Sequence, residues 1–289
     1  MRERLHAALV IARRQAFETL LSPGLYVTLA FGLVLGALLV TGFASSIDSS
    51  GFNPTIAPLY DLIGRSITGV FGAAFMEKLF AEGPFLFALV VSFLPVFLFL
   101  VISSVFRFGQ EKTSGAVELL AYGPSDGTSY FIACFLKDAV FTLLALGTIV
   151  LFLCIAAVPS NLALGPLFLT AVPVLFSLTL AIFAYGILCS ILSANASSAL
   201  AAFLGILLVF FLVLAGSLAI ASTSVRTVAS GAAAVVQWIS PFFYASLCIK
   251  AAQGGSAGGI LAGVALQLAL AAVLLTAGHF AISRKGVRA

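Results

Sequence analysis

The sequence contains very little charge. Only 8% of its 289 residues are Asp, Glu, Lys or Arg, whereas a soluble domain has about 25%. Apolar residues make up 62% of the chain and the mean hydropathy is +1.21. A soluble fold of this length cannot bury so much apolar surface. The composition therefore excludes a soluble enzyme, a disordered chain and a secreted disulfide scaffold, and it requires a protein embedded in lipid.

The few charges leave long uncharged gaps between them. The longest gap, from Asp138 to Arg226, has room for three helical spans of about 20 residues each. The apolar runs are continuous and do not alternate with polar residues, which favours helices over membrane strands. We predict an all-α polytopic membrane protein with six transmembrane helices. The predicted spans are about 25–45, 84–106, 130–158, 167–192, 199–221 and 258–282.

An amphipathic helix is predicted before the first span, at residues 2–21. Its apolar side chains recur at steps of three and four residues, which places them on one face. These residues are Leu5, Leu9, Ala12, Ala16 and Leu20. Arg13 and Arg14 are predicted to anchor this helix at the membrane interface through anionic lipids. The Gly32-x-x-x-Gly36 pattern in the first span suits close helix packing, either inside the bundle or between two copies.

The number of spans depends on residues 222–257. This segment could form a seventh span, but Pro241 and several aromatic residues favour short helices that enter the membrane and return. With six spans, ten Lys and Arg residues lie on the side of both termini and four on the other side. The positive-inside rule then predicts cytoplasmic termini, a cytoplasmic loop at 107–129, and external segments at 46–83 and 222–257.

Several kinds of chemistry are missing from the sequence. No Asp or Glu is expected at mid-depth in a span, which argues against an ion-coupled carrier. Lys112-Thr113 follows Glu111 rather than Gly, so the chain has no phosphate-binding P-loop. The two histidines, His6 and His279, lie at opposite ends of the chain. We predict no catalytic, metal-binding or cofactor-binding residues, no enzymatic activity of the chain by itself, and no nucleic-acid partner.

The polar loop contains the most informative motif, between Arg107 and Pro124. Glu111 and Glu118 are seven residues apart and would share one face of a continuous helix. Val117, Leu120 and Ala121 form an apolar stripe beside them, and Gly123-Pro124 ends the segment. Such a helix could bind in a groove on a soluble partner, or it could lie solvated on the membrane surface. Local physical chemistry leaves both alternatives open.

The motif resembles the loop of permease subunits of type-2 ATP-binding-cassette (ABC) transporters. That family pattern is Glu, three residues, Gly, often Thr, any residue, Glu, two aliphatic residues and then Pro. The corresponding residues here are Glu111, Gly115, Glu118, Leu119, Leu120 and Pro124, with Ala116 in place of the usual Thr. The resemblance extends to the N-terminal elbow helix, the six spans, the short connector 193–198 and the Ser240-Pro241-Phe242 element. Segment 46–83 is most similar to the branch associated with copper-enzyme maturation and gliding motility.

The resemblance implies a function that depends on partners. Two copies, or this chain and a related permease, would form an export pathway in a bacterial inner membrane. Two separate ATPase subunits would bind ATP and Mg²⁺, and the six motif residues would couple them to the spans. Connector 193–198 would add a smaller contact. The alternatives are a membrane scaffold or assembly factor that does not transport, and an ion-coupled secondary carrier.

Overall fold

The structure is a computed structural model that describes residues 2–48, 84–115, 127–160, 164–222 and 236–285. These residues form helices joined by short turns, and no strand occurs among them. The helices are α1 (Arg2–Leu20), α2 (Pro23–Asp48), α5 (Pro84–Thr113), α7 (Gly127–Ser160), α8 (Pro166–Leu192), α9 (Ala196–Ser222), α11 (Pro241–Gln253) and α12 (Ala257–Lys285).

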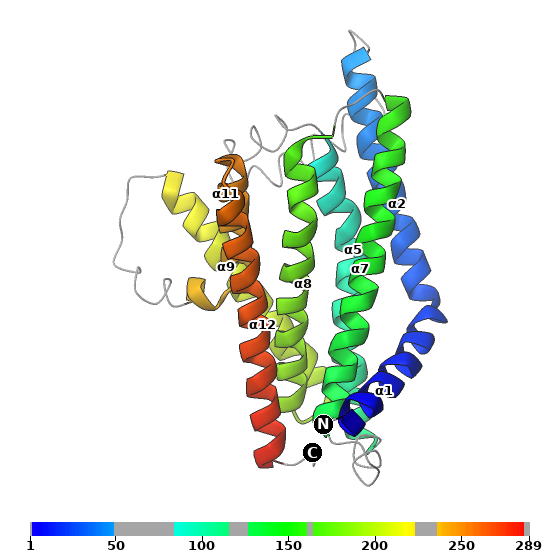
Figure 1. Ribbon diagram of the computed structural model, residues 1–289, viewed down its shortest axis with the longest axis vertical. Coiled ribbons are helices and arrows are strands. Elements are labelled where there is room, and N and C mark those ends of the chain that lie inside the picture. Colours follow the sequence, from blue (N-terminus) through cyan, green and yellow to red (C-terminus); the bar gives the residue numbers. More distant parts are fainter. Residues whose placement is uncertain (1, 49–83, 116–126, 161–163, 223–235, 286–289) are drawn as a thin grey trace.

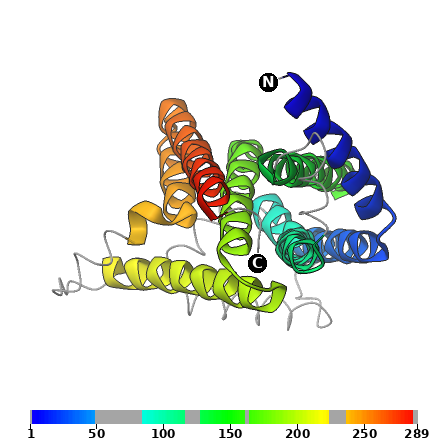
Figure 2. The same cartoon turned by 90° about the horizontal axis from the view of Figure 1, so that it is seen from below.

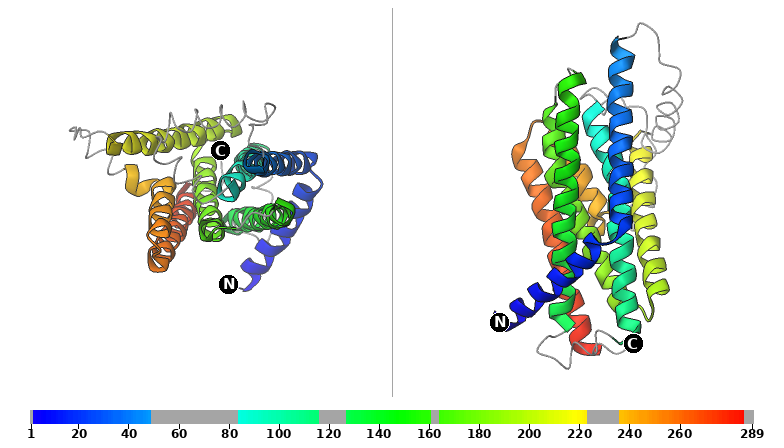
Figure 3. Two further views of the ribbon diagram at one scale, coloured as in Figure 1. Left: turned by 90° about the horizontal axis from the view of Figure 1, so that it is seen from above. Right: turned by 90° about the vertical axis from the view of Figure 1, so that its right-hand side faces the viewer.

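Six of these helices, α2, α5, α7, α8, α9 and α12, are long and apolar enough to cross a membrane. Five of them run along a similar direction and α9 is tilted relative to them, whereas α1 lies oblique to the bundle (Figures 1 and 3). The chain is therefore an all-α polytopic membrane protein, which confirms the prediction of six spans. The start of α1 and the end of α12 lie at the same end of the bundle (Figure 1).

Helix α5 is longer than the sequence predicted. It continues to Thr113, beyond the expected end of the span at residue 106, and α7 already begins at Gly127. The apolar run marks only the part of a helix that crosses lipid, whereas backbone hydrogen bonding continues into the polar residues beyond it. Most of segment 46–83, which the sequence predicts to be external, lies outside the described residues.

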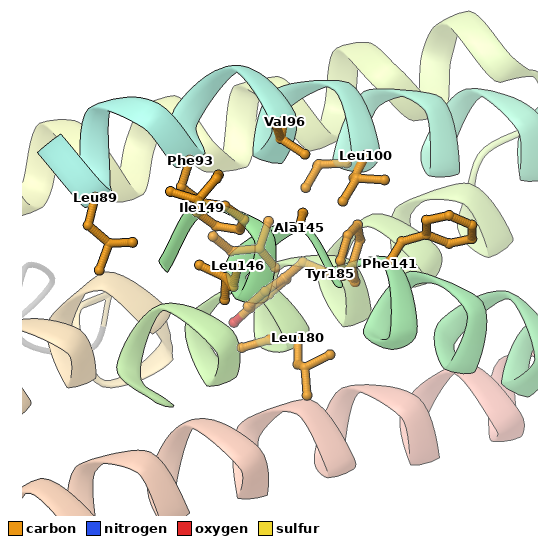
Figure 4. Packing of buried hydrophobic residues seen from close by; sticks show 14 of the residues in the cluster. Leu89, Phe93, Val96, Leu100, Phe141, Ala145, Leu146, Ile149, Leu180 and Tyr185 are labelled. Atoms are coloured by element: carbon orange, nitrogen blue, oxygen red, sulfur yellow. The ribbon is translucent and has the colours of Figure 1, made fainter. Parts of the chain in front are cut away.

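Helix α8 lies at the centre of the bundle and packs against α5, α7, α9, α11 and α12 (Figure 2). The main cluster of buried apolar side chains lies between α5, α7 and α8 (Figure 4). Phe93 and Leu100 of α5 face Leu146 and Ile149 of α7, and Leu180 comes from α8. This packing fixes the position of α5, whose C-terminal end leads into the loop with the predicted motif.

The Gly32-x-x-x-Gly36 pattern serves packing inside the chain. A Cβ atom on Gly32 would overlap the backbone carbonyl of Ser92 on α5, and one on Gly36 would overlap the Ser92 hydroxyl. Glycine at both positions lets α2 and α5 approach each other closely. Of the two alternatives that the pattern allowed, the structure therefore shows packing within the bundle.

Helices α11 and α12 form a hairpin. The turn between them includes Gly255, whose φ of +68° suits glycine. The fully buried Gln267 of α12 donates from Nε2 to the Pro241 carbonyl at 3.3 Å and accepts a hydrogen bond from Ser177 of α8. These bonds hold the start of α11 against both neighbouring helices. The rest of the predicted re-entrant segment, residues 223–235, lies outside the described residues.

Candidate functional site at the end of helix α5

Two of the six predicted motif residues lie in the part of the chain that the structure describes. Glu111 is half-buried in the last turn of α5, and Gly115 follows the end of that helix with a φ of +74°. A positive φ interrupts an α-helix, so α5 does not continue through Gly115, and the continuous helix on which a shared face of Glu111 and Glu118 depends is interrupted there. Glu111 belongs to the membrane-spanning helix. The other motif residues, Glu118, Leu119, Leu120 and Pro124, lie outside the described residues.

Lys112 joins the end of α5 to the end of α8. Its Nζ donates hydrogen bonds to the carbonyl oxygens of Ile191, at 3.1 Å, and Ser193, at 2.7 Å. The last carbonyl groups of a helix have no partner within the helix and carry a partial negative charge, so a lysine there is stabilising. The contact brings the start of the motif loop to connector 193–198, although the residues it joins are about 80 positions apart in sequence.

The start of α9 packs against the same part of α5. Gly109 lies so close to Ala196 that a Cβ atom on it would be 2.6 Å from the Ala196 Cα. Asn195 and Ser198 exchange hydrogen bonds across the first turn of α9, from Ser198 N to Asn195 Oδ1 at 2.8 Å and from Asn195 N to Ser198 Oγ at 3.3 Å. This reciprocal pair caps α9 and gives the short connector a defined shape.

The carboxylate of Glu18 connects α1 to α5. Glu18 accepts from Arg14 on its own helix at 3.1 Å and from Arg107 on α5 at 3.4 Å. All three side chains are partly or largely exposed, so each contact contributes little stability by itself. The predicted anchor residues Arg13 and Arg14 both lie on the exposed surface of α1.

A buried ion pair within α7 is hydrogen-bonded to α5. Lys137 and Asp138 of α7 are 5% and 1% exposed, and Lys137 Nζ lies 2.8 Å from Asp138 Oδ1. The other carboxylate oxygen accepts a hydrogen bond from Ser104 of α5. Charged residues inside a membrane helix are rare, and when they occur they pair with each other or face the protein interior.

The face of α1 that packs on α7 overlaps only partly with the predicted apolar face. Ala8, Ala12, Gln15 and Thr19 are buried, and Ala12 belongs to the predicted face, whereas Leu9 of that face is 55% exposed. Small side chains let two helices approach closely, and large apolar side chains can face lipid. The predicted face was chosen for hydrophobicity, a criterion that does not separate contact with lipid from contact with protein.

Comparisons of the chain with protein-family models, with curated proteins and with solved structures found no match. The α5 end, defined as residues 104–115, contacts α7 through Ser104, α1 through Arg107 and the end of α8 through Lys112. A displacement of the chain that follows Gly115 would therefore act on a helix that contacts α7, α1 and α8.

Proposed function

We propose that the chain is the permease subunit of a type-2 ABC transporter in a bacterial inner membrane, with both termini in the cytoplasm. Two copies, or this chain and a related permease, form the substrate pathway and support export. Two separate ATPase subunits, which bind ATP and Mg²⁺, contact the loop that contains Glu118 and Pro124. Movement of the ATPase subunits changes the arrangement of the spans through that loop.

The α5 end is the observation that supports this proposal. The motif loop joins Gly115 to Gly127 in the sequence, so it leaves directly from the α5 end and returns directly into α7. Ser104 and Asp138 connect these two helices inside the bundle. A partner that moves the loop therefore acts on two connected helices, because packed helices transmit displacement as rigid elements.

The contact of Lys112 with the end of α8 supports the second predicted contact, connector 193–198. Lys112 lies three residues before Gly115 and binds the Ser193 carbonyl. One soluble partner below this end of the bundle could therefore reach both the loop and the connector. The proposal assigns the larger contact to the loop, because the loop carries the complete motif.

Purification of the chain in mild detergent from its native host tests the proposal. We expect a stoichiometric P-loop ATPase in the eluate, and ATP-dependent movement of a substrate after reconstitution of that complex. A stable partner without nucleotide-dependent transport would favour the scaffold. Transport driven by an ion gradient in vesicles of the chain alone would favour the secondary carrier. Either of these results would contradict the proposal.

Reversal of charge at Glu118 should weaken the coupling between the two kinds of subunit. In the Glu118→Lys variant we expect ATP-driven transport to fall at least about fivefold, which corresponds to about 1 kcal/mol of coupling free energy. The bundle should remain folded, because the substitution lies outside the spans. Glu82→Lys, in the predicted external segment, is the matched control and should transport normally. Unchanged transport by Glu118→Lys would contradict the assigned role.

Removal of the Lys112 ammonium should loosen the α5 end. The Lys112→Met variant keeps an apolar stem but leaves the carbonyls of Ile191 and Ser193 without this donor. We expect the free energy of unfolding to fall by about 1 kcal/mol, measured by reversible unfolding in mixed micelles. Lys250→Met removes an exposed ammonium on α11 and should have no comparable effect. Equal stability of the two variants would show that the Lys112 hydrogen bonds contribute nothing.

A further inference from the structure

The outward surface of α1 carries large apolar side chains. Val10, Phe17 and Leu21, which follows the helix, are 57%, 65% and 72% exposed, whereas the face against α7 is lined by smaller residues such as Ala8 and Ala12. In a water-soluble helix the large apolar residues would be buried instead. The exposed surface of α1 is therefore suited to contact with lipid.

This surface contains a shallow, open hollow lined by Val10, Arg13, Arg14, Phe17 and Glu18, all of α1. An open hollow along one helix leaves most of a ligand exposed, which suits a lipid whose acyl chains remain in the bilayer. The lining combines two guanidinium groups with two exposed apolar side chains. A ligand that fits such a lining carries a negative charge and an apolar part next to it.

More positive than negative side chains line the hollow. Two arginines face one carboxylate, and Glu18 is shared between Arg14 at 3.1 Å and Arg107 at 3.4 Å. Arg13 forms no ion pair or hydrogen bond with any residue that the structure describes. The hollow is therefore positive, and the Arg13 guanidinium is available for an anionic ligand. A guanidinium group matches the geometry of phosphate oxygens well.

We propose that this hollow binds one anionic phospholipid. The phosphodiester accepts hydrogen bonds from Arg13 and Arg14, and an acyl chain lies against Val10 and Phe17. General attraction between arginines and an anionic membrane needs charge alone. The proposed site also needs the apolar wall, so it goes beyond an interfacial anchor. It is independent of the proposed transport function and can be tested without an ATPase.

Glu18 is the only acidic residue that lines the hollow. Its carboxylate repels a phosphate and competes with it for Arg14. The Glu18→Gln variant should therefore bind the anionic lipid more tightly than the original chain does. A variant that improves binding is informative, because a folding defect cannot produce that result.

Native mass spectrometry of the full chain tests the site. The protein is exposed to phosphatidylglycerol or phosphatidylcholine with identical acyl chains. We expect one retained phosphatidylglycerol per chain and a preference on the order of tenfold over phosphatidylcholine. Inorganic phosphate should not displace the lipid, because it cannot contact the apolar wall. Displacement by phosphate, or equal retention of both lipids, would overturn the proposal.

Variants test the charged contacts and the apolar contacts of the site separately. The double variant Arg13→Gln/Arg14→Gln should lose the preference for phosphatidylglycerol. Phe17→Ala should shorten lipid retention although it leaves every charge in place, and Glu18→Gln should increase retention. Lys250→Gln, which removes an exposed cation on α11, is the control and should behave as the original chain does. Loss of preference in that control, or full retention in the double variant, would show that no discrete site exists.

Discussion

Replacement of Asp138 by alanine should lower the free energy of unfolding by about 3–5 kcal/mol. The substitution leaves the Lys137 ammonium, which is 5% exposed, without its carboxylate partner at 2.8 Å. It also removes the acceptor of the Ser104 hydroxyl. Isolated charge is very costly away from water, so this variant should be less stable than any exposed-site variant proposed above.

Unfolding of the Asp138→Ala variant can be followed with a thiol-reactive dye. Cys134, Cys189 and Cys248 are free and buried, so they react only when the bundle opens. The double variant Lys137→Met/Asp138→Leu provides the control, because it removes both charges and keeps apolar side chains of similar size. It should recover most of the lost stability. If it were as unstable as Asp138→Ala, the loss would come from packing and not from an unpaired charge.

Replacement of Gly32 by alanine should be the second most damaging change to the bundle. The added methyl group would overlap the carbonyl oxygen of Ser92, which belongs to the backbone and cannot rotate away. Separation of α2 from α5 should cost about 1–3 kcal/mol. The same dye assay measures this loss in the purified chain.

The chain offers a matched control for this prediction. Gly205, within α9, has open space around the position of a Cβ atom. Gly205→Ala should leave stability unchanged or raise it by up to about 1 kcal/mol, because alanine favours the helix more than glycine does. If both alanine variants behaved alike, close packing of α2 on α5 would not contribute to stability.

The sequence predicted the spans well because the membrane imposes a simple length requirement on apolar runs. Helices α8 and α9 begin and end within a few residues of the predicted positions. The end of α5 was predicted less well. Most residues from Arg107 to Thr113 are polar, and composition does not show whether polar residues beyond a span continue the helix.

The contacts of the candidate site could not be predicted from local patterns. Ser104 is 34 residues from Asp138, and Lys112 is 81 residues from Ser193. Pairs at such distances meet only through the packing of whole helices. The same holds for Gly32 and Gly36, whose spacing fits a contact inside the bundle and also a contact between copies. The neighbouring Ser92 decides between these alternatives.

The sequence by itself determined that this chain is an all-α membrane protein with six spans, because apolar run length and the scarcity of charge allow little else. It also supplied the motif around Glu118 on which the proposed function rests. Only the tertiary structure decided which surface of α1 packs on protein and that the Lys137–Asp138 pair is enclosed. These features depend on which helices become neighbours, and the packing of complete side-chain surfaces determines that choice.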